Sequence, residues 1–282
     1  MSNPKQFSSL QPAQHKEEPP VPDPALPPVI GTLPDVAGDD QQKVVSAAQQ
    51  LNGLPVTLPI WPNAAEFPGE FDLVEAYIDN NRAFSEEFEG PLTDDIDILI
   101  KSPRLRSHGP KVFTYSVTIF GGPNGATSDP ITVFVDAIDP NGNNRPGAIL
   151  LPANLPSEGV TPAYLAANGG VTLTLSRPVD SRPGDTFIVF YGVDDLVGTT
   201  GVVPFPATAP ITITYTTAQI MGFGPGDHLV TFQFIDRAGN ATQISTARTL
   251  SVKLSDPPVM PAPQIPEAAP LVVKEEARGG YW

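Results

Sequence analysis

The stretch HLVTFQFIDRAGN, residues 228–240, decides the fold that we expect for this chain. Apolar side chains alternate with polar ones along VTFQF, which is the period of a β-strand with one buried and one solvent-facing side. The residues DRAGN follow, and Asp, Gly and Asn are the types that turns favour. The stretch also brings four polar side chains close together in sequence, which raises the question of a reactive site: His228, Asp236, Arg237 and Asn240.

A similar stretch, KVFTYSVTIFGGP, lies upstream at residues 111–123 and belongs to a longer internal match. Residues 55–110 align without a gap on residues 170–225, and 13 of these 56 positions are identical. After a two-residue shift, the match continues to the end of the second copy. Matching alternation predicts matching structure, because a register slip of one residue would expose every buried side chain. We therefore interpret the chain as a duplication.

The comparison of the two copies bears on the polar residues of the opening stretch. Ile119 and Phe120 stand in the first copy where Asp236 and Arg237 stand in the second, whereas the alternating aromatic face and a turn glycine occur in both. Features that the fold requires should be common to both copies. We therefore interpret residues 228–240 as a strand and its hairpin turn rather than as a reactive site.

Short strands separated by Gly, Pro, Asp and Asn turns favour an all-β fold of two aligned antiparallel sheets in each copy. The longest helical candidate, DDQQKVVSAAQQL, offers at most about three turns. A short leading strand is expected at PVIGTLP and at GAILLP. The main strands of the first copy, each with a counterpart in the second, are predicted near residues 56–60, 71–78, 96–100, 112–119 and 131–137.

The predicted organisation has two sandwiches, at residues 29–140 and 141–258, between two flanking segments. Residues 1–28 have the composition of a disordered Pro-rich arm, and residues 259–282 that of a Pro-rich linker or tail. The tail stretch PAPQIPEAAPLVV echoes RPGAILLPANLP at the start of the second copy. This echo suggests that the chain belongs to a longer domain array.

The segment GDHLVTFQFIDRAGNATQISTARTLSVKL resembles the last two strands of bacterial immunoglobulin-like or fibronectin type III-like tandem domains. Those domains carry an aromatic alternating strand, an Asp-x-Ala-Gly-Asn turn, Ser/Thr-rich residues and a final VxV-like strand. The first copy departs from this pattern at Ile119 and Phe120. The resemblance covers about residues 29–256 and implies tandem immunoglobulin-like β-sandwiches of modular surface, secreted or virion proteins. It transfers no catalytic residue.

Composition and charge restrict the classes of function. The chain has no cysteine, which excludes disulfides, thiolate metal sites and a cysteine nucleophile. Its net charge of −15 disfavours nucleic-acid binding, because such binding rests on neutralising phosphates with Lys and Arg. No signal peptide is visible at the N-terminus, and no apolar run is long enough for membrane insertion. An extracellular or cell-surface location is therefore implied by the resemblance alone.

No local motif indicates catalysis, so we predict that the chain is not an enzyme. The three histidines, His15, His108 and His228, lie outside any HExxH pattern, and neither a GxSxG elbow nor a phosphate-binding loop occurs. Two acidic clusters, SEEFEG at residues 85–90 and TDDIDILI at residues 93–100, belong to the first copy only. They are interpreted as solvated strand faces that discourage edge-to-edge pairing, with attraction of cations as the alternative.

Calcium is the one cofactor for which the sequence offers candidate ligands. The join between the copies, DAIDPNGNNRPG, places several oxygen donors in a short turn, and Ca²⁺ prefers six to eight oxygens in flexible loops. The alternative is an ordinary turn, since Asp, Asn, Gly and Pro are the residues that turns require. The candidate ligands are Asp136, Asp139, Asn141 and Asn143.

Trp61 is the one candidate for binding a ligand. Aromatic residues at alternate strand positions are expected in the core of any sandwich, but Trp61 aligns with Ser176, so packing common to both copies does not require it. An exposed Trp61 would point to a sugar-binding platform. A buried one would belong to the core.

These observations together predict a non-enzymatic modular spacer or adhesion-type binding region of a bacterial or phage-associated surface protein. The alternative is a carbohydrate-binding accessory module of an enzyme system. The expected partner is a protein or glycan surface ligand, and neither nucleic acid nor membrane insertion is expected.

Overall fold

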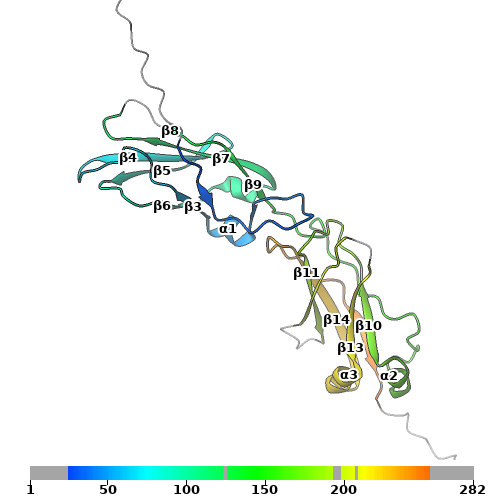
Figure 1. Cartoon of the computed structure of the whole chain (residues 1–282). Helices are drawn as coiled ribbons and strands as arrows, with labels where there is room; N and C mark the ends of the chain where they lie inside the picture. The colour runs from blue at the N-terminus through cyan, green and yellow to red at the C-terminus, as the bar shows by residue number, and fades with distance from the viewer. Residues whose placement is uncertain (1–24, 123–125, 193–197, 207–208, 255–282) are drawn as a thin grey trace, which may run out of the picture.

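The computed structural model describes residues 25–122, 126–192, 198–206 and 209–254. Strands form two immunoglobulin-like β-sandwiches that lie end to end, each around its own hydrophobic core (Figure 1). The predicted all-β class and the two tandem sandwiches are confirmed. The Pro-rich tail at residues 259–282 and nearly all of the predicted arm at residues 1–28 lie outside the described residues.

The first sandwich packs a three-stranded sheet, of order β1-β3-β6, against a larger one, of order β2-β9-β7-β4-β5, and β8 pairs with β7 outside this order. All neighbouring strands are antiparallel except β2 and β9, which are parallel. The strands are β1 (Val29–Ile30), β2 (Val44–Val45), β3 (Leu54–Leu58), β4 (Phe71–Ile78), β5 (Asn81–Glu89), β6 (Ile96–Ile100), β7 (Gly109–Thr118), β8 (Ala126–Thr127) and β9 (Ile131–Val135).

The second sandwich packs β10 and β13 against a sheet of order β12-β11-β14-β15, all antiparallel. A single antiparallel bridge joins Leu150 to Thr174 of β10, and a single parallel bridge joins Val160 to Val252 of β15. The strands are β10 (Gly170–Leu175), β11 (Thr186–Tyr191), β12 (Thr199–Val202), β13 (Ile211–Thr216), β14 (Gly226–Ile235) and β15 (Arg248–Val252).

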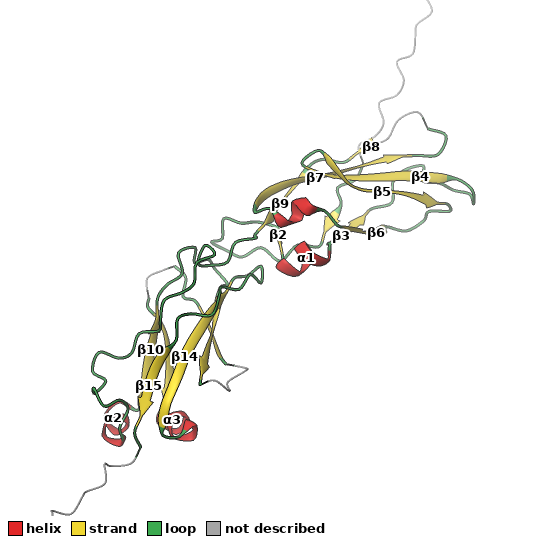
Figure 2. Cartoon of the chain, turned by 180° about the vertical axis from the view of Figure 1, so that it is seen from behind, coloured by secondary structure: helices red, strands yellow, loops and turns green. Residues whose placement is uncertain are grey.

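Short helices occupy equivalent connections in the two sandwiches (Figure 2). Helix α1 (Ala47–Asn52) precedes β3, and helix α2 (Pro162–Asn168) precedes β10. The 3-10 helix η1 (Pro103–Arg106) and helix α3 (Thr217–Phe223) each precede the long strand β7 or β14. The helical candidate at residues 39–51 is therefore helical only at its end, where Ser46 and Gln49 form a capping box.

The predicted alternation reflects the burial of the strands. In β4, Val74, Ala76 and Ile78 are buried, and in β7 the same holds for Phe113 and Tyr115. Asp79 and Asn80, with φ angles of 52° and 59°, form the turn between β4 and β5. Left-handed backbone at both turn positions matches the twist of a two-residue hairpin, and Asp and Asn tolerate it.

Strands β7 and β14 show how the two copies correspond. Gly109 pairs with Val135 in the first sandwich, and Gly226 pairs with Val252 in the second, so an offset of 117 relates both pairs. The sequence alignment had instead matched Gly109 with Gly224. The two extra residues thus precede this strand, because α3 in the second copy is longer than η1 in the first.

Candidate functional site

A cluster of charged side chains lies where the two sandwiches meet. The loop between β1 and β2 carries Asp39, whose side chain is only 1% exposed, to the second sandwich. Arg237, in the turn after β14, donates from Nη2 to Asp39 Oδ2 at 2.6 Å. Arg237 also donates to the carbonyl oxygens of Pro34 and Gln41, at 2.8 and 2.9 Å. One guanidinium therefore binds three acceptors of a single loop.

A second arginine approaches the same loop from the segment that leads into β11. Arg182 Nη1 lies 3.4 Å from Asp39 Oδ1, and it also contacts the exposed carboxylate of Asp40. Its Nη2 lies 3.2 Å from Asp180 Oδ1. Asp39 is thus paired from two sides, and a buried carboxylate without such partners would be costly.

Main-chain groups complete the contact. The N–H of Ala47, the first residue of α1, donates to the carbonyl oxygen of Ala238 at 2.7 Å. The side-chain amide of Asn240 donates to the carbonyl oxygen of Asp136 at 2.8 Å, and Gln50 donates to that same oxygen at 2.6 Å. We call this set of contacts between the β1–β2 loop, α1, Asp136 and the turn after β14 the joint.

The turn that presents Arg237 is itself fixed by a buried carboxylate. Asp236 accepts hydrogen bonds from the main-chain and side-chain nitrogens of Asn240, both at 2.7 Å. Gly239, in the same turn, has a φ of 94°, a backbone conformation that favours glycine. Burial raises the pKa of Asp236 to about 6, although hydrogen bonds from Asn240 oppose the shift.

Asp185 is the second buried carboxyl beside the joint. Its Oδ2 accepts from the main-chain N–H of Arg182 at 2.7 Å, and its side chain is fully buried. Burial raises its pKa to about 7, and the charges of Asp236 and Asp180 act in the same direction. Asp185 Oδ1 has no hydrogen-bond partner among the described residues.

The four polar residues of the opening stretch do not form one reactive site. His228 lies near the start of β14, where its ring is 4.9 Å from that of Tyr191 and its Nε2 is 3.0 Å from the carbonyl oxygen of Gly224. Asp236, Arg237 and Asn240 follow the other end of the same ten-residue strand. The interpretation as a strand and hairpin is correct, but it missed that the hairpin turn holds the first sandwich. The difference between the copies at Asp236 and Arg237 was the signal that could have revealed it.

The calcium candidates lie next to the joint, and the chain already uses several of their oxygens. Asp139 Oδ1 accepts from the main-chain nitrogens of Asn141 and Asn143, at 2.8 and 3.1 Å. Asp136 Oδ1 lies 3.3 Å from His108 Nδ1. In the part of the chain that the structure describes, no group of three or more His, Asp or Glu side chains could hold a metal ion. The ordinary turn and the calcium site both remain predictions.

Trp61 is only 4% exposed and belongs to the core of the first sandwich. Its Nε1 donates to Asp72 Oδ2 at 2.7 Å, and the buried Asp72 also accepts from the main-chain nitrogens of Ala65 and Phe120. At the aligned positions, the second copy replaces the Trp61–Asp72 pair by Ser176 and Phe187. A sugar-binding platform required an exposed Trp61, and that condition is not met.

The acidic clusters of the first sandwich lie on exposed positions of β5 and β6 and of the loop that precedes β6. Glu86, Glu87 and Glu89 are exposed on β5, an edge strand of the larger sheet. Asp95 and Asp97 accept hydrogen bonds from Ile60 N and Thr57 Oγ1, at 3.0 and 2.6 Å. This placement agrees with charged, solvated strand faces.

No family model matches this chain, and no curated protein matches it. Similar solved structures include the FN1–FN3 domains of chicken CNTN1, with 8% identity and a TM-score of 0.41 over 82% of this chain and 68% of that one. A structure reported for host cell surface retention of a 1.5-MDa bacterial ice-binding adhesin has 13% identity and a TM-score of 0.42, over 82% of this chain and 65% of that one. The chain thus spans about two thirds of the length of each.

The predicted resemblance holds at the level of fold. Both units are β-sandwiches of the immunoglobulin-like and fibronectin type III-like kind, as their strand order shows. Among the described residues, no helix is long and apolar enough to cross a membrane.

Proposed function

We propose that the chain is a non-enzymatic spacer and binding region that holds two β-sandwiches at a fixed angle in a modular bacterial or phage-associated surface protein. The observation that carries this proposal is the joint. Domains of one chain move relative to each other unless their interface restrains them. Here a buried ion pair between Arg237 and Asp39 and several hydrogen bonds restrain the two sandwiches.

The division between the proposed domains, residues 29–140 and 141–258, is supported by two separate hydrophobic cores, and the first core also includes Ala25, which precedes the proposed limit. The buried residues of one core end at Val135, and those of the other begin at Ile149. A duplication is supported by the equal strand registers of β7 and β14.

The non-enzymatic part of the proposal rests on how the polar groups are used. Asp39, Asp236 and Asp72 accept hydrogen bonds that fix loops or the joint. A general base must instead reach the proton of a substrate. Asp185, whose Oδ1 has no hydrogen-bond partner among the described residues, is fully buried. The carbohydrate-binding alternative finds no support at Trp61, which is buried.

Membership of a longer array would require a different joint at the far end of the second sandwich. There Pro162 stands where Ala47 donates its N–H. Proline has no N–H to donate. A further sandwich on that side would therefore be held by other contacts, and the proposed spacer unit is the pair of sandwiches.

Distance measurements between spin labels test the spacer proposal. The chain has no cysteine, so Ser85→Cys on β5 and Thr249→Cys on β15, both exposed, introduce labels without background. We expect one narrow distance distribution for the parent chain, and a broader one after Arg237→Ala. A parent distribution as broad as that of the variant would show that the joint does not fix the sandwiches.

A further inference from the structure

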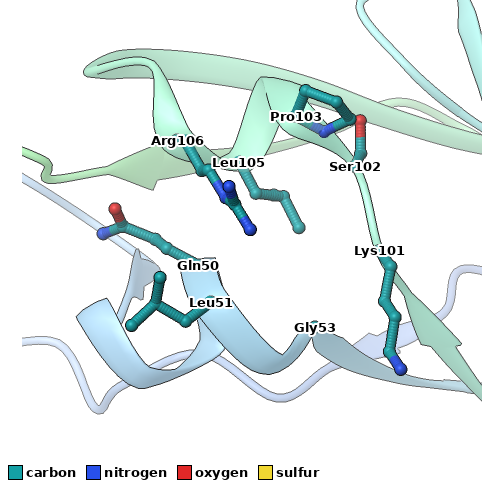
Figure 3. Close-up of a pocket in the computed structure, with 8 residues that line it drawn as sticks. All are labelled: Gln50, Leu51, Gly53, Lys101, Ser102, Pro103, Leu105 and Arg106. Atoms are coloured by element: carbon teal, nitrogen blue, oxygen red, sulfur yellow. The ribbon is translucent and has the colours of Figure 1, made fainter.

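A small pocket lies between α1 and η1 of the first sandwich, with a volume of about 230 Å³. Figure 3 shows the side chains of Leu105 and Arg106 extending from η1 toward α1, which contributes Gln50 and Leu51. The wall is both apolar and cationic. The lining residues are Gln50, Leu51, Gly53, Lys101, Ser102, Pro103, Leu105 and Arg106.

The pocket is positively charged within an acidic chain. Residues 101–111 contain four Lys or Arg residues and no Asp or Glu, although the whole chain has a net charge of −15. Lys101, Arg104 and Arg106 are exposed, and in the described part of the chain none of them pairs with a carboxylate. Neighbouring unpaired cations repel each other, so this arrangement favours the approach of an anion.

The fold does not require these cations. At the aligned positions the second sandwich carries Thr216, Gln219 and Met221, and α3 forms there with neutral residues. Ile220, which aligns with Leu105, is buried in the same way. The apolar anchor is therefore shared by both copies, and the positive charge is specific to the first.

We propose that this pocket binds an acidic residue flanked by an apolar one, presented by a protein partner. Lys101 and Arg106 would pair with the carboxylate, and Leu51 and Pro103 would contact the apolar side chain. The volume lies below the roughly 300–1,000 Å³ of small-molecule sites, so it suits one or two side chains. This inference rests on the proposed function as a binding region and names its partner class.

The lining chemistry favours a peptide over other anionic partners. No aromatic residue lines the pocket, so a sugar ring would find no stacking surface. A nucleic acid or another long polyanion would meet the repulsion of a chain with a net charge of −15. A short peptide with one carboxylate meets little of that repulsion.

Nuclear magnetic resonance titration of the full chain tests the proposal. The probes are the acetylated, amidated tripeptide Leu-Glu-Leu and its counterpart Leu-Gln-Leu, with sodium sulfate and a sulfated oligosaccharide at equal ionic strength. The test variant Lys101→Thr/Arg106→Met introduces the residues that the second sandwich carries, so the fold should tolerate them. The control variant is Arg248→Thr, which removes an exposed cation from β15.

We expect Leu-Glu-Leu to shift the amide signals of Gly53, Ser102 and Arg106 saturably, with an affinity about tenfold above that of Leu-Gln-Leu, as one charged hydrogen bond provides. The double variant should lose this difference and keep its dispersed spectrum, and Arg248→Thr should retain it. Equal binding of both peptides, no saturable shift, or tighter binding of sulfate or of the sulfated oligosaccharide would overturn the proposal. Each of these results would leave the spin-label test of the joint unaffected.

Discussion

Replacing Arg237 by alanine is the sharpest test of how the sandwiches are held. The substitution removes three hydrogen bonds to the β1–β2 loop and leaves Asp39, only 1% exposed, without its shorter ion pair. Removing one partner of a buried ion pair costs about 3–5 kcal/mol, because the other charge stays buried. Arg182 still lies 3.4 Å from Asp39, so we expect the lower end, about 3 kcal/mol.

The loss should appear in the unfolding of whichever sandwich unfolds first, since that step breaks the joint. Urea denaturation followed by circular dichroism measures it. The variant Asp39→Asn, alone and combined with Arg237→Ala, completes a double-mutant cycle. In Asp39→Asn, Arg237 donates to a neutral side chain, and that hydrogen bond contributes about 1 kcal/mol. The two substitutions should therefore couple by about 2 kcal/mol.

Arg248→Ala is the matched control, because Arg248 is exposed on β15 and makes no ion pair among the described residues. Its effect should stay within about 0.5 kcal/mol. If Arg237→Ala also stayed within that limit, or if its effect were the same with Asp39 and with Asn at position 39, the reasoning about the buried pair would be refuted.

Three further outcomes follow from the buried polar groups. The pKa of Asp185 is raised to about 7 and that of Asp236 to about 6, so the folded state binds these protons more tightly than the unfolded state does. Their contribution to stability is complete below about pH 4 and is lost as the pH rises through 6 to 7. The unfolding midpoint should therefore fall between pH 5 and 8, and this fall should be smaller in Asp185→Asn. An equal fall of the midpoint in the variant would contradict this. Trp61→Phe leaves Asp72 with one donor fewer, and we expect a loss of about 1–3 kcal/mol in urea denaturation; a neutral effect would show that water replaces the indole N–H. Because Asp139 Oδ1 already accepts two main-chain hydrogen bonds, calorimetry should give the same midpoint with calcium as with a chelator, whereas a higher midpoint with calcium would establish the site.

The strands of this protein could be predicted because their signal is local. Residues 71–78 were predicted as a strand and form β4 with those bounds, and residues 131–137 contain β9. Side chains of a strand alternate between its two faces, so burial leaves a period of two in the sequence itself. The leading strands were predicted longer than they are, since only Val29–Ile30 and a single bridge at Leu150 pair.

The position of the copy shift was wrong for an instructive reason. Gly109 and Gly224 match in letter, but Gly226 holds the equivalent place in the sheet. Gly109 and Pro110 begin β7, whereas Gly224 and Pro225 lie between α3 and β14, so the identical letters do not mark equivalent places. The hydrogen-bonded pairing with β9 and β15 defines the equivalence, and that pairing joins segments distant in sequence.

The candidate site shows most clearly which features the sequence predicts and which only the folded chain reveals. Arg237 is a polar residue of the second copy that the first copy replaces by Phe120. The sequence therefore indicated only that the strand and its turn do not require it. Its partner Asp39 lies 198 residues away, so no spacing or motif could connect the two. From the sequence, Trp61 could have been a core or a surface residue, because no sequence pattern shows that its indole N–H donates to a buried Asp72. Alternation, composition and turn residues determined an all-β chain of two sandwiches. Which polar groups meet was decided by the folded chain, since a buried charge finds its partner in space and not along the sequence.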